Sequence, residues 1–532
     1  MDASNPPPVR WRVPRLALGP DPAAAWRAVG LRDPAPLVDP QGRLIVDDAG
    51  RAVLYFTSNL GEGRGQGVGR AVSRDGGRRW TVEPEGPVLA PSADGWDGGI
   101  ATTAWVSRVA NGFLMFYRGA RTPYLDEGIG RAFSADGVRF ERQARPILTA
   151  RDFAGIPHEG RHMMGVLNCV RLFDDRFLIT FEATSASHDG DTQIFGAVSD
   201  DGRSFAPVND GFPLFSRDHV STLPARRVAN PRILRDDERG RYVLTFNAQH
   251  QWIYWLGQAE TTDFSTWTER PENPLLLPSG FPGEGIFSGR IEGGVDVRSP
   301  GGERQLYVMG IPRASKSHEG AGIGIASPDA PPAVPLPAGW LAATDSVSAV
   351  AGTADGPGVV LRAAGAEVPV AAYWRGSARQ ASGGGLSVRL SAEAGTTALV
   401  VYGTCPGATF ARGGIRIALA SGRLYVGAPR RVEESAFRPF VDGIVESALA
   451  AVPFDGQKGA EVIMTRSAEG WTIAVDGRAV CALPRSAVAV KGEPGVLSCY
   501  VAGGEGAFTL RTTAGAATQG AAQAGARRGE SR

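Results

Sequence analysis

The sequence is poor in cysteine, in unbalanced charge and in long apolar runs, and each shortage excludes a class of protein. Its 532 residues include four cysteines, at positions 169, 405, 481 and 499, with no CxxC spacing, so we expect buried free thiols. Lys and Arg total 56 against 55 Asp and Glu, which leaves no basic surface for nucleic acid. No stretch reaches the roughly 18 apolar residues of a membrane span, and no signal peptide is visible at the N-terminus. We expect a soluble, cytoplasmic protein without nucleic-acid or membrane partners.

Histidine is also scarce, and motifs for bound cofactors are missing. Of the six histidines, His158 and His162 form one close pair, in a loop with Gly and Met neighbours, and such a loop is not typical of a zinc site. The Gly-rich stretch at residues 61–69 lacks the Lys-Ser/Thr of a nucleotide-binding loop. We therefore expect neither a metal ion nor an organic cofactor.

A short phrase occurs five times at nearly constant spacing. Its first copy is Ser73-Arg-Asp75-Gly-Gly-Arg-Arg-Trp80, and its last copy is shortened to Ser327-Pro-Asp329. The Asp stands at positions 75, 136, 201, 263 and 329, so successive copies are 61 to 66 residues apart, which is too long for a helical repeat. Asp-Gly favours a tight turn, and the aromatic residue that follows can pack between neighbouring sheets. The repeat indicates five similar β-sheets in a ring.

Each repeat also contains an apolar run of strand length. Runs such as Ala52-Val-Leu-Tyr-Phe56 and Tyr242-Val-Leu-Thr-Phe246 are rich in aromatic and β-branched residues and are bounded by turn formers. Each run lies about 15–20 residues before its turn phrase, which leaves room for four short strands per repeat. We predict an all-β fold with a five-bladed β-propeller over residues 30–330. Residues 1–29 are an N-terminal segment that packs on the propeller or closes it.

The composition changes after the fifth repeat. Residues 331–339 are Pro-rich and predict a stiff linker. Residues 340–512 contain alternating strands without the turn phrase, among them the amphipathic run from Trp471 to Gly477, in which we expect Trp471 to be buried. We predict a C-terminal β-sandwich of jelly-roll or concanavalin-like type. The Gly-, Ala-, Gln- and Arg-rich tail at residues 513–532 cannot bury a core and is expected to be disordered.

A five-bladed propeller followed by a β-sandwich resembles the layout of the furanosidase clan, glycoside hydrolase families 32, 43, 62 and 68. In that clan an acid in an Asp-Pro pair, at the start of the innermost strand of blade one, serves as nucleophile or base. The segment Leu31-Arg32-Asp33-Pro34 looks like this element. The resemblance implies that Asp33 is the nucleophile or base of a glycosidase. Without the blade context, Asp-Pro is equally typical of a turn ahead of a strand.

The other two acids of the clan match less well. The resemblance implies an Asp in blade two and a general-acid Glu in blade three. The aligned strand starts hold Thr103 and Asn168, and an amide cannot donate a proton to a leaving oxygen. Loops ahead of these strands offer Asp97 as the carboxylate that stabilises the transition state and Glu159 as the general acid.

The identity of the general acid is open between three glutamates. Glu159 lies in the loop with the densest cluster of titratable groups, although a surface ion pair with Arg161 would explain it equally well. Glu182 follows a core strand of blade three. Glu292 precedes Gly-Gly, which resembles the Glu-Gly-Pro of arabinanase-type acids, but it falls in blade five.

Polar and aromatic residues recur at hairpins of several repeats, as a carbohydrate site requires. Aromatic faces pack on sugar rings, while polar side chains bond hydroxyls that would otherwise be buried unpaired. The expected substrate-binding residues are Trp96, Arg118, His158, His162, Asn168, His188, Asn230, Trp252 and Glu292.

We therefore expect a glycoside hydrolase that acts on an oligosaccharide or glycoside and releases terminal fructosyl or arabinosyl-like furanosyl units. Asp33, Asp97 and Glu159 are its expected catalytic residues. If Arg226 and Arg227 face the funnel, a phosphate-dependent glycoside phosphorylase becomes the alternative. If no acid lies near Asp33, the protein is a non-catalytic sugar-binding propeller. The sequence does not indicate the oligomeric state.

Overall fold

The computed structural model divides the chain into two compact units. Unit one comprises Met1–Pro278 and Gly285–Ala330, and unit two comprises Ser279–Glu284 and Pro331–Arg532. The structure describes residues 10–12, 14–60, 65–159, 162–223, 225–250, 253–278, 286–287, 289–312, 318–329, 340–342, 347–349, 358–363, 370–375, 385–403, 415–427, 437–456, 458–484 and 496–513. The predicted linker at 331–339 and residues 514–532 of the predicted tail lie outside the described residues.

Unit one contains five four-stranded antiparallel blades, counted over the described residues. The innermost strands, in blade order, are β3 (Leu31–Pro36), β7 (Ile100–Val109), β12 (Met164–Arg171), β16 (Arg227–Asp236) and β20 (Arg290–Arg298). The second strands are β4 (Ala52–Asn59), β8 (Gly112–Ala120), β13 (Phe177–Thr184), β17 (Arg241–His250) and β21 (Arg304–Ile311). The third strands are β5 (Gln66–Ser73), β9 (Gly128–Ser134), β14 (Thr192–Ser199), β18 (Ile253–Thr261) and β22 (Gly322–Ala326). The outermost strands are β6 (Thr81–Val82), β10 (Glu141–Arg142), β15 (Ala206–Pro207), β19 (Thr268–Glu269) and β2 (Arg15–Leu18).

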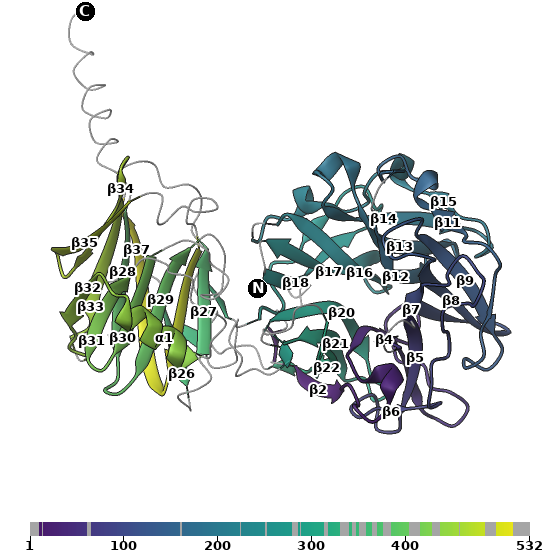
Figure 1. Ribbon diagram of the computed structural model, residues 1–532, viewed down its shortest axis with the longest axis horizontal. Helices are drawn as coiled ribbons and strands as arrows, with labels where there is room; N and C mark the ends of the chain where they lie inside the picture. Colours follow the sequence, from purple (N-terminus) through teal and green to yellow (C-terminus); the bar gives the residue numbers. More distant parts are fainter. Residues whose placement is uncertain are drawn as a thin grey trace, which may run out of the picture. The chain divides into compact units, whose positions relative to one another are not determined.

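The five blades close into a ring (Figure 1). Each innermost strand contacts the innermost strand of the next blade, and β20 contacts β3. The N-terminal strand β2 pairs with β22, so blade five combines both ends of unit one, and β1 (Arg10–Trp11) pairs with β23 (Pro328–Asp329) as a second tie. One parallel pairing between Gln66 and Ile100 joins blades one and two into a nine-stranded sheet that also includes β11 (Leu148–Thr149). The predicted five-bladed propeller is confirmed.

The second strands are the apolar runs of the sequence, and their burial explains their composition. β4 and β13 are each buried along their first seven residues, because a neighbouring blade covers each of their faces. A strand covered on both faces has no solvent side to be polar, so it reads as a continuous apolar run. These runs therefore mark the blades in the sequence.

The repeated Asp phrase forms the turn between the third and outermost strands of blades one to four. In blade two, Asp136 accepts hydrogen bonds from the backbone N–H groups of Val138 and Arg139, at 2.9 Å each, and from the hydroxyl of Ser134. These bonds lower the pKa of Asp136 to about 2. The aromatic residue that ends the phrase, Phe140, packs edge-on against Tyr55 of blade one. The turn therefore stabilises its own hairpin and the junction between two blades, as the sequence predicts.

The turn in blade three permits a matched test of this role. Asp201 accepts hydrogen bonds from the backbone N–H groups of Arg203 and Ser204, whereas its exposed neighbour Asp200 lies one residue outside this network. We expect Asp201→Ala to lower the unfolding temperature by a few degrees and Asp200→Ala to change it much less, as measured by calorimetry. These bonds lower the pKa of Asp201, so its contribution is present above the unfolded-state pKa and is lost as the pH falls through the folded-state pKa. Equal unfolding temperatures of the two variants at pH 7 would contradict this role.

Unit two is a β-sandwich of two seven-stranded antiparallel sheets, counted over the described residues. One sheet has the order β24 (Trp340–Ala342), β27 (Val370–Arg375), β36 (Val496–Ala502), β29 (Thr397–Gly403), β30 (Ile415–Ala420), β31 (Arg423–Gly427) and β32 (Ala450–Pro453). The other has the order β25 (Val347–Ala349), β26 (Gly358–Ala363), β37 (Gly504–Thr513), β28 (Gly385–Ala392), β33 (Ala460–Arg466), β34 (Gly470–Val475) and β35 (Arg478–Pro484).

The two sheets of unit two share one apolar core. Trp471 of β34 is 3% exposed and meets Tyr402 of β29 edge-on, with ring centroids 5.6 Å apart, so the predicted burial of this tryptophan is confirmed. The α-helix α1 (Phe437–Glu446), which the sequence did not predict, contacts β30 and β31 and buries Phe437 and Phe440.

Helical structure in unit one is confined to single 3-10 turns within the described residues. Besides the short piece at residues 286–287, these are η1 (Ala25–Arg27), η2 (Ala150–Asp152), η3 (Ala186–His188), η4 (Asn209–Gly211) and η5 (Arg217–His219). No helix in the described part of the chain has the length and apolar character needed to cross a bilayer.

Of the described cysteines, Cys169 and Cys499 are buried free thiols and Cys481 is a half-buried one.

Candidate active site

Every innermost strand of the propeller bulges at the same place. The pairing with the second strand shifts register after Arg32, Thr102, Gly165, Ala229 and Glu292. The next residue in each blade has a positive φ: Asp33 at 51°, Thr103 at 46°, Val166 at 47°, Asn230 at 53° and Gly293 at 69°. Side chains rarely adopt this conformation, and β-branched residues such as Thr and Val do so only under strain, which is typical of functional sites. The bulges thus define equivalent positions around the ring.

Residues of the preceding blade bind the bulges. The backbone N–H of Thr103 donates to Thr57 at 2.9 Å, that of Asn230 donates to Glu182 at 2.9 Å, and that of Gly293 donates to Asn247 at 2.8 Å. In the register, Thr57, Glu182 and Asn247 each lie on a second strand, opposite the residue that precedes the bulge of their own blade. We call the bulge residues, the residues before them and these second-strand partners the axis layer. Blade three has a carboxylate, Glu182, at the second-strand position where blades one and four have the neutral acceptors Thr57 and Asn247.

Asp33 is the bulge residue of blade one. It is 4% exposed, and its Oδ2 atom has no hydrogen-bond partner among the described residues. The two carboxylates that interact electrostatically with it are Glu182 of blade three and Glu292 of blade five. The structure therefore places two buried acids near Asp33, which is the arrangement that separates a glycosidase site from a simple turn.

Glu182, in β13, is the acid most perturbed by its surroundings. Burial, the largest cause, and the charges of Glu292 and Asp33 together raise its pKa to about 8, against the hydrogen bond from the Asn230 N–H. Its strand partner is Gly165, where a side chain would meet Arg118 Cδ at 2.6 Å. Glycine at this position therefore lets the Arg118 side chain approach, and the charge of Arg118 lowers the pKa of Glu182 in part.

Glu292, in β20, is joined to Glu182 through Asn230. The Asn230 amide nitrogen lies 3.4 Å from Glu292 Oε2, and its backbone N–H binds Glu182. Burial also raises the pKa of Glu292, against the charge of Arg290, whose guanidinium lies 3.3 Å from Glu292 Oε1. One asparagine thus positions two carboxyl groups that both favour the protonated form.

Arginine and histidine side chains surround these acids. Arg118 donates to Glu127 through Nε and Nη2, and its guanidinium lies 5.2 Å from the Tyr124 ring centre. The Arg32 side chain is 9% exposed and interacts with Asp33 and Glu292. Burial, together with the charges of Arg32 and Arg290, lowers the pKa of His318 to about 3, so this imidazole is neutral at physiological pH.

The oxygen atoms of Asp97, the predicted transition-state carboxylate, are engaged within the protein. Asp97 is fully buried and accepts hydrogen bonds from Ser92, from the Tyr117 hydroxyl at 2.9 Å and from Arg142 at 2.8 Å. Its neighbour Trp96, predicted to stack on sugar, instead stacks on Tyr117 with ring centroids 6.0 Å apart. Both residues hold the segment that leads into β7.

The loop ahead of β12 contains three further predicted site residues, two of which are exposed and one of which is buried. Glu159 and His158 are exposed, and His158 Nε2 lies 3.2 Å from the Phe153 carbonyl oxygen. His162 is 5% exposed, its backbone N–H donates to Tyr124, and neither ring nitrogen has a partner among the described residues. His162 therefore stays a candidate for substrate binding beside Arg118, whereas the buried acids are on other elements.

Two further predicted substrate-binding residues have structural roles, and one lies outside the described part. Asn168 lies two residues beyond the bulge of β12, is fully buried and accepts the Ile233 N–H at 2.9 Å, so it ties blade three to blade four. His188 contacts the hydroxyls of Ser185 and Ser187 and lies 3.1 Å from Asp218. Trp252 lies outside the described residues.

Arg226 and Arg227, on which the phosphorylase alternative depended, both bind Asp191. Their Nε atoms lie 2.5 Å and 3.0 Å from its two oxygens, and Arg217 lies 3.6 Å away. Asp191 is 2% exposed, so this carboxylate is fully used within the protein. Arg226 and Arg227 therefore belong to an ion-pair network within the protein.

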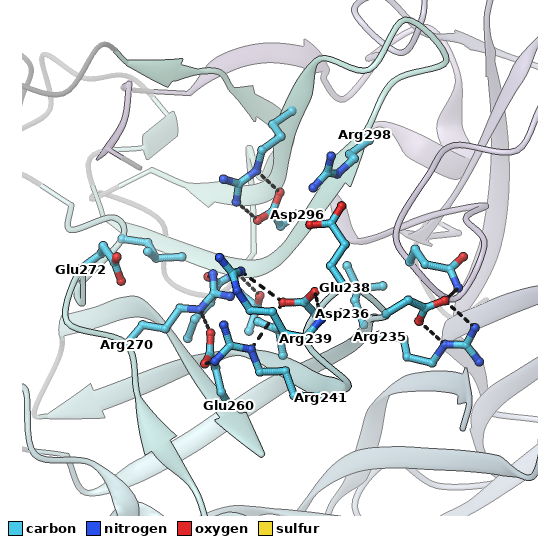
Figure 2. A pocket seen from close by; sticks show the side chains of 18 of the residues that line it. Arg235, Asp236, Glu238, Arg239, Arg241, Glu260, Arg270, Glu272, Asp296 and Arg298 are labelled. Carbon is cyan, nitrogen blue, oxygen red and sulfur yellow. Dashed lines mark hydrogen bonds and ion pairs between the residues drawn. The ribbon is translucent and has the colours of Figure 1, made fainter. Parts of the chain in front are cut away.

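A separate pocket of about 680 Å³ is lined mainly by blade-four and blade-five residues, together with Trp11, Gln41 and Arg43 (Figure 2). Its charged side chains bind one another: Arg241 bonds Asp236 and Glu260, and Arg304 bonds Asp296. Arg235 binds Asp237 through Nε and Nη2, at 2.6 and 2.9 Å. These mutual pairs neutralise the pocket, and none of the axis-layer acids lines it.

The described residues contain no group of three or more His, Cys, Asp or Glu side chains placed to hold a metal ion. The sequence did not mark Arg32 and Arg232, which interact electrostatically with Asp33, or Arg290, which interacts with Glu292, as candidates. The signal for Glu182 is its pairing opposite Gly165, which is visible only once the strand register is known.

No protein-family model matches the chain, and no curated protein matches it. Several solved structures are similar to it. The endo-arabinase from Bacteroides thetaiotaomicron is 14% identical with a TM-score of 0.40, over 56% of this chain and 94% of that one. The sucrose-6-phosphate hydrolase from Lactobacillus gasseri is 11% identical with a TM-score of 0.43, over 94% of this chain and 93% of that one. The Bombyx mori GH32 β-fructofuranosidase BmSUC1 is 12% identical with a TM-score of 0.43, over 94% of each chain. The activities in these names are those of the proteins that carry them.

Proposed function

We propose that the protein is a glycoside hydrolase whose reacting groups are Asp33 and Glu182, with Glu292 as a substrate-binding acid beside them. The terminal glycosyl unit of the substrate enters the axis layer, where the five blades converge. The resemblance of the Leu31–Pro34 segment to the furanosidase clan favours a furanosyl unit of fructosyl or arabinosyl type. No metal or organic cofactor is part of this proposal.

The observation that carries the proposal is the carboxyl group of Glu182. Thr57 and Asn247 bind the bulge of the next blade with neutral oxygen atoms, so the fold does not require a carboxylate at this position. A buried carboxyl beside two other acids destabilises the folded protein wherever it ionises, since its pKa is raised to about 8. Residues that lower stability without a packing benefit are expected at functional sites.

In the proposed reaction Glu182 is the general acid. A carboxyl with a pKa near 8 is protonated at pH 7 and can transfer its proton to the glycosidic oxygen as the bond from that oxygen to the anomeric carbon breaks. Asp33, whose Oδ2 has no partner among the described residues, attacks the anomeric carbon or removes a proton from the attacking water. Asn230 and Glu292 bond sugar hydroxyls on the side between the two acids.

The test is a screen of the purified protein with 4-nitrophenyl furanosides and short oligosaccharides, with and without phosphate. Hydrolysis independent of phosphate supports the proposal, and NMR of the first-formed anomer then distinguishes Asp33 as nucleophile from Asp33 as base. Turnover that requires phosphate would identify a phosphorylase instead. Sugar binding without any turnover would identify a non-catalytic propeller.

A further inference from the structure

Arg32 is the axis-layer side chain whose hydrogen-bonding groups are least satisfied by the protein. Its side chain is 9% exposed, and its Nε and Nη2 atoms are both buried without a hydrogen-bond partner among the described residues. Leaving a buried donor unpaired is unfavourable, and more so for a charged group. Since Arg32 directly precedes Asp33, a bound glycosyl unit is well placed to supply the missing acceptors.

The neighbouring guanidinium groups already have partners in the protein. Arg118 binds Glu127, and Arg290 lies 3.3 Å from Glu292. Arg232 donates to the carbonyl oxygens of Leu167 and Pro231 at 2.8 and 3.0 Å and lies over the Trp105 ring. The Nε atom of Arg232 also lacks a partner among the described residues, but only in Arg32 are Nε and Nη2 both buried without one.

Several arginines of this protein hold a carboxylate through the Nε–Nη2 edge of the guanidinium. Arg118 binds Glu127 through Nε and Nη2, and Arg235 and Arg304 bind Asp237 and Asp296 through the same two atoms (Figure 2). Two parallel N–H groups match the two oxygens of a planar carboxylate. The open edge of Arg32 therefore has the geometry of half an arginine–carboxylate pair.

The charge around Arg32 also leaves room for one anion. The arginines of this cluster and the carboxyl groups that interact with them are Arg32, Arg118, Arg232 and Arg290, and Asp33, Glu127, Glu182 and Glu292. Because the pKa of Glu182 is raised to about 8, it is mainly protonated at pH 7, so the positive charges outnumber the negative ones. A substrate carboxylate would restore the balance.

We infer that Arg32 recognises a carboxylate on the bound sugar, so that the preferred glycosyl unit is a uronic acid. This inference rests on the proposed function for the location of the sugar, and it deepens that function by naming the substrate class. Arg32 is then a specificity-determining residue, which binds the carboxylate while Asp33 and Glu182 act on the glycosidic bond.

The experiment measures sugar binding by calorimetry, with free uronic acids and their parent neutral sugars as probes. Free D-galacturonic acid, D-glucuronic acid, D-galactose and D-glucose populate furanose and pyranose rings in solution, so the ring form is not prejudged. We expect at least one uronic acid to bind about 10- to 100-fold more tightly than its parent sugar, because a bidentate charged pair is gained. Galactose 6-sulfate is the competing anion and should bind more weakly than the uronate.

Variants then assign the preference to Arg32. Arg32→Gln should reduce the ratio of uronate to neutral-sugar affinity to near one. Arg32→Lys should retain part of the preference, since lysine keeps the positive charge but lacks the two coplanar N–H donors of arginine. Arg145→Gln, an equal loss of charge at an exposed position, should leave the ratio unchanged. Each ratio compares two affinities measured on the same variant, so a general loss of stability lowers both affinities and does not change the ratio.

The outcomes separate this inference from the proposed function. Cleavage of glycosides with equal affinity for uronates and neutral sugars, or a preference that survives in Arg32→Gln, overturns the inference and leaves the hydrolase intact. Uronate binding that depends on Arg32, without cleavage of any glycoside, supports the inference and overturns the hydrolase. Equal binding of the sulfated sugar would overturn the assignment of a carboxylate.

Discussion

Asp33→Asn should abolish turnover while the propeller stays folded. The substitution preserves shape and removes only the charge that stabilises a developing oxocarbenium ion, so we expect a loss of about 10³-fold or more in kcat on an aryl glycoside. A nucleophile or base is needed whatever the leaving group, so activated and unactivated substrates should lose activity alike. The measurement is the initial rate of 4-nitrophenol release for the wild type and the variant.

Two further measurements show whether the loss comes from chemistry or from unfolding. The charge of Asp33 contributes to the raised pKa of Glu182, so Asp33→Asn should lower that pKa, as followed by NMR of 13C-labelled glutamate. Removing one of three mutually repelling acids should also leave the unfolding temperature unchanged or higher. Asp200→Asn, the same change at an exposed position, should alter neither activity nor stability. Full activity in Asp33→Asn would remove Asp33 from the mechanism.

The fold could be predicted from the sequence because its signals are local. The turn phrase acts within a few residues, since Asp136 binds the backbone of residues 138 and 139. The second strands are apolar because neighbouring blades cover them, and this signal recurs in all five blades, whereas the turn recurs in blades one to four. Helix α1 was missed because it packs on the sandwich through Phe437 and Phe440, and this burial is a tertiary feature.

The site could be predicted only in part, because it depends on strand register. Each bulge inserts residues that the apolar pattern does not reveal, so alignment by apolar runs placed Asn168 where the structure has Val166. Glu182 reaches the axis layer from a second strand, opposite Gly165, and no short motif marks that pairing. The pairing of Asp97 with Arg142 could not be predicted, because the two residues are 45 positions apart in the chain. Asp33 was found because its Asp-Pro pair lies next to the first core strand.

Glu182→Gln should separate substrates by their leaving groups. Gln can still accept the Asn230 N–H, so the axis layer keeps its geometry, but it has no proton to donate. We expect kcat to fall by about 10²–10⁴-fold on oligosaccharides, whose leaving groups need protonation, and to change little on dinitrophenyl glycosides, whose leaving groups do not. Glu159→Gln, at the exposed glutamate, is the control and should leave both substrates unaffected. Glu292→Gln tests the competing assignment, and the same leaving-group dependence there but not in Glu182→Gln would transfer the acid role to Glu292.

The pH dependence provides a second and independent readout of the same group. With a folded-state pKa of about 8, Glu182 should lose its proton as the pH rises through 8, so the activity of the wild type on oligosaccharides should decline there, and this decline should be absent from Glu182→Gln.

The stability of the folded protein should depend on the ionisation of the same group. Its pKa is raised from 4.5, so its contribution is fully present below pH 4.5 and is lost progressively as the pH rises to about 8. Gln does not titrate, so the variant does not lose this contribution. As the pH rises from 4.5 to 8, the unfolding free energy of the variant should therefore increase relative to that of the wild type, by a few kcal/mol at most, as measured with urea. A stability difference that stays constant from pH 4.5 to 8 would show that Glu182 is not buried as a protonated acid, and the proposed general acid would have to be sought elsewhere.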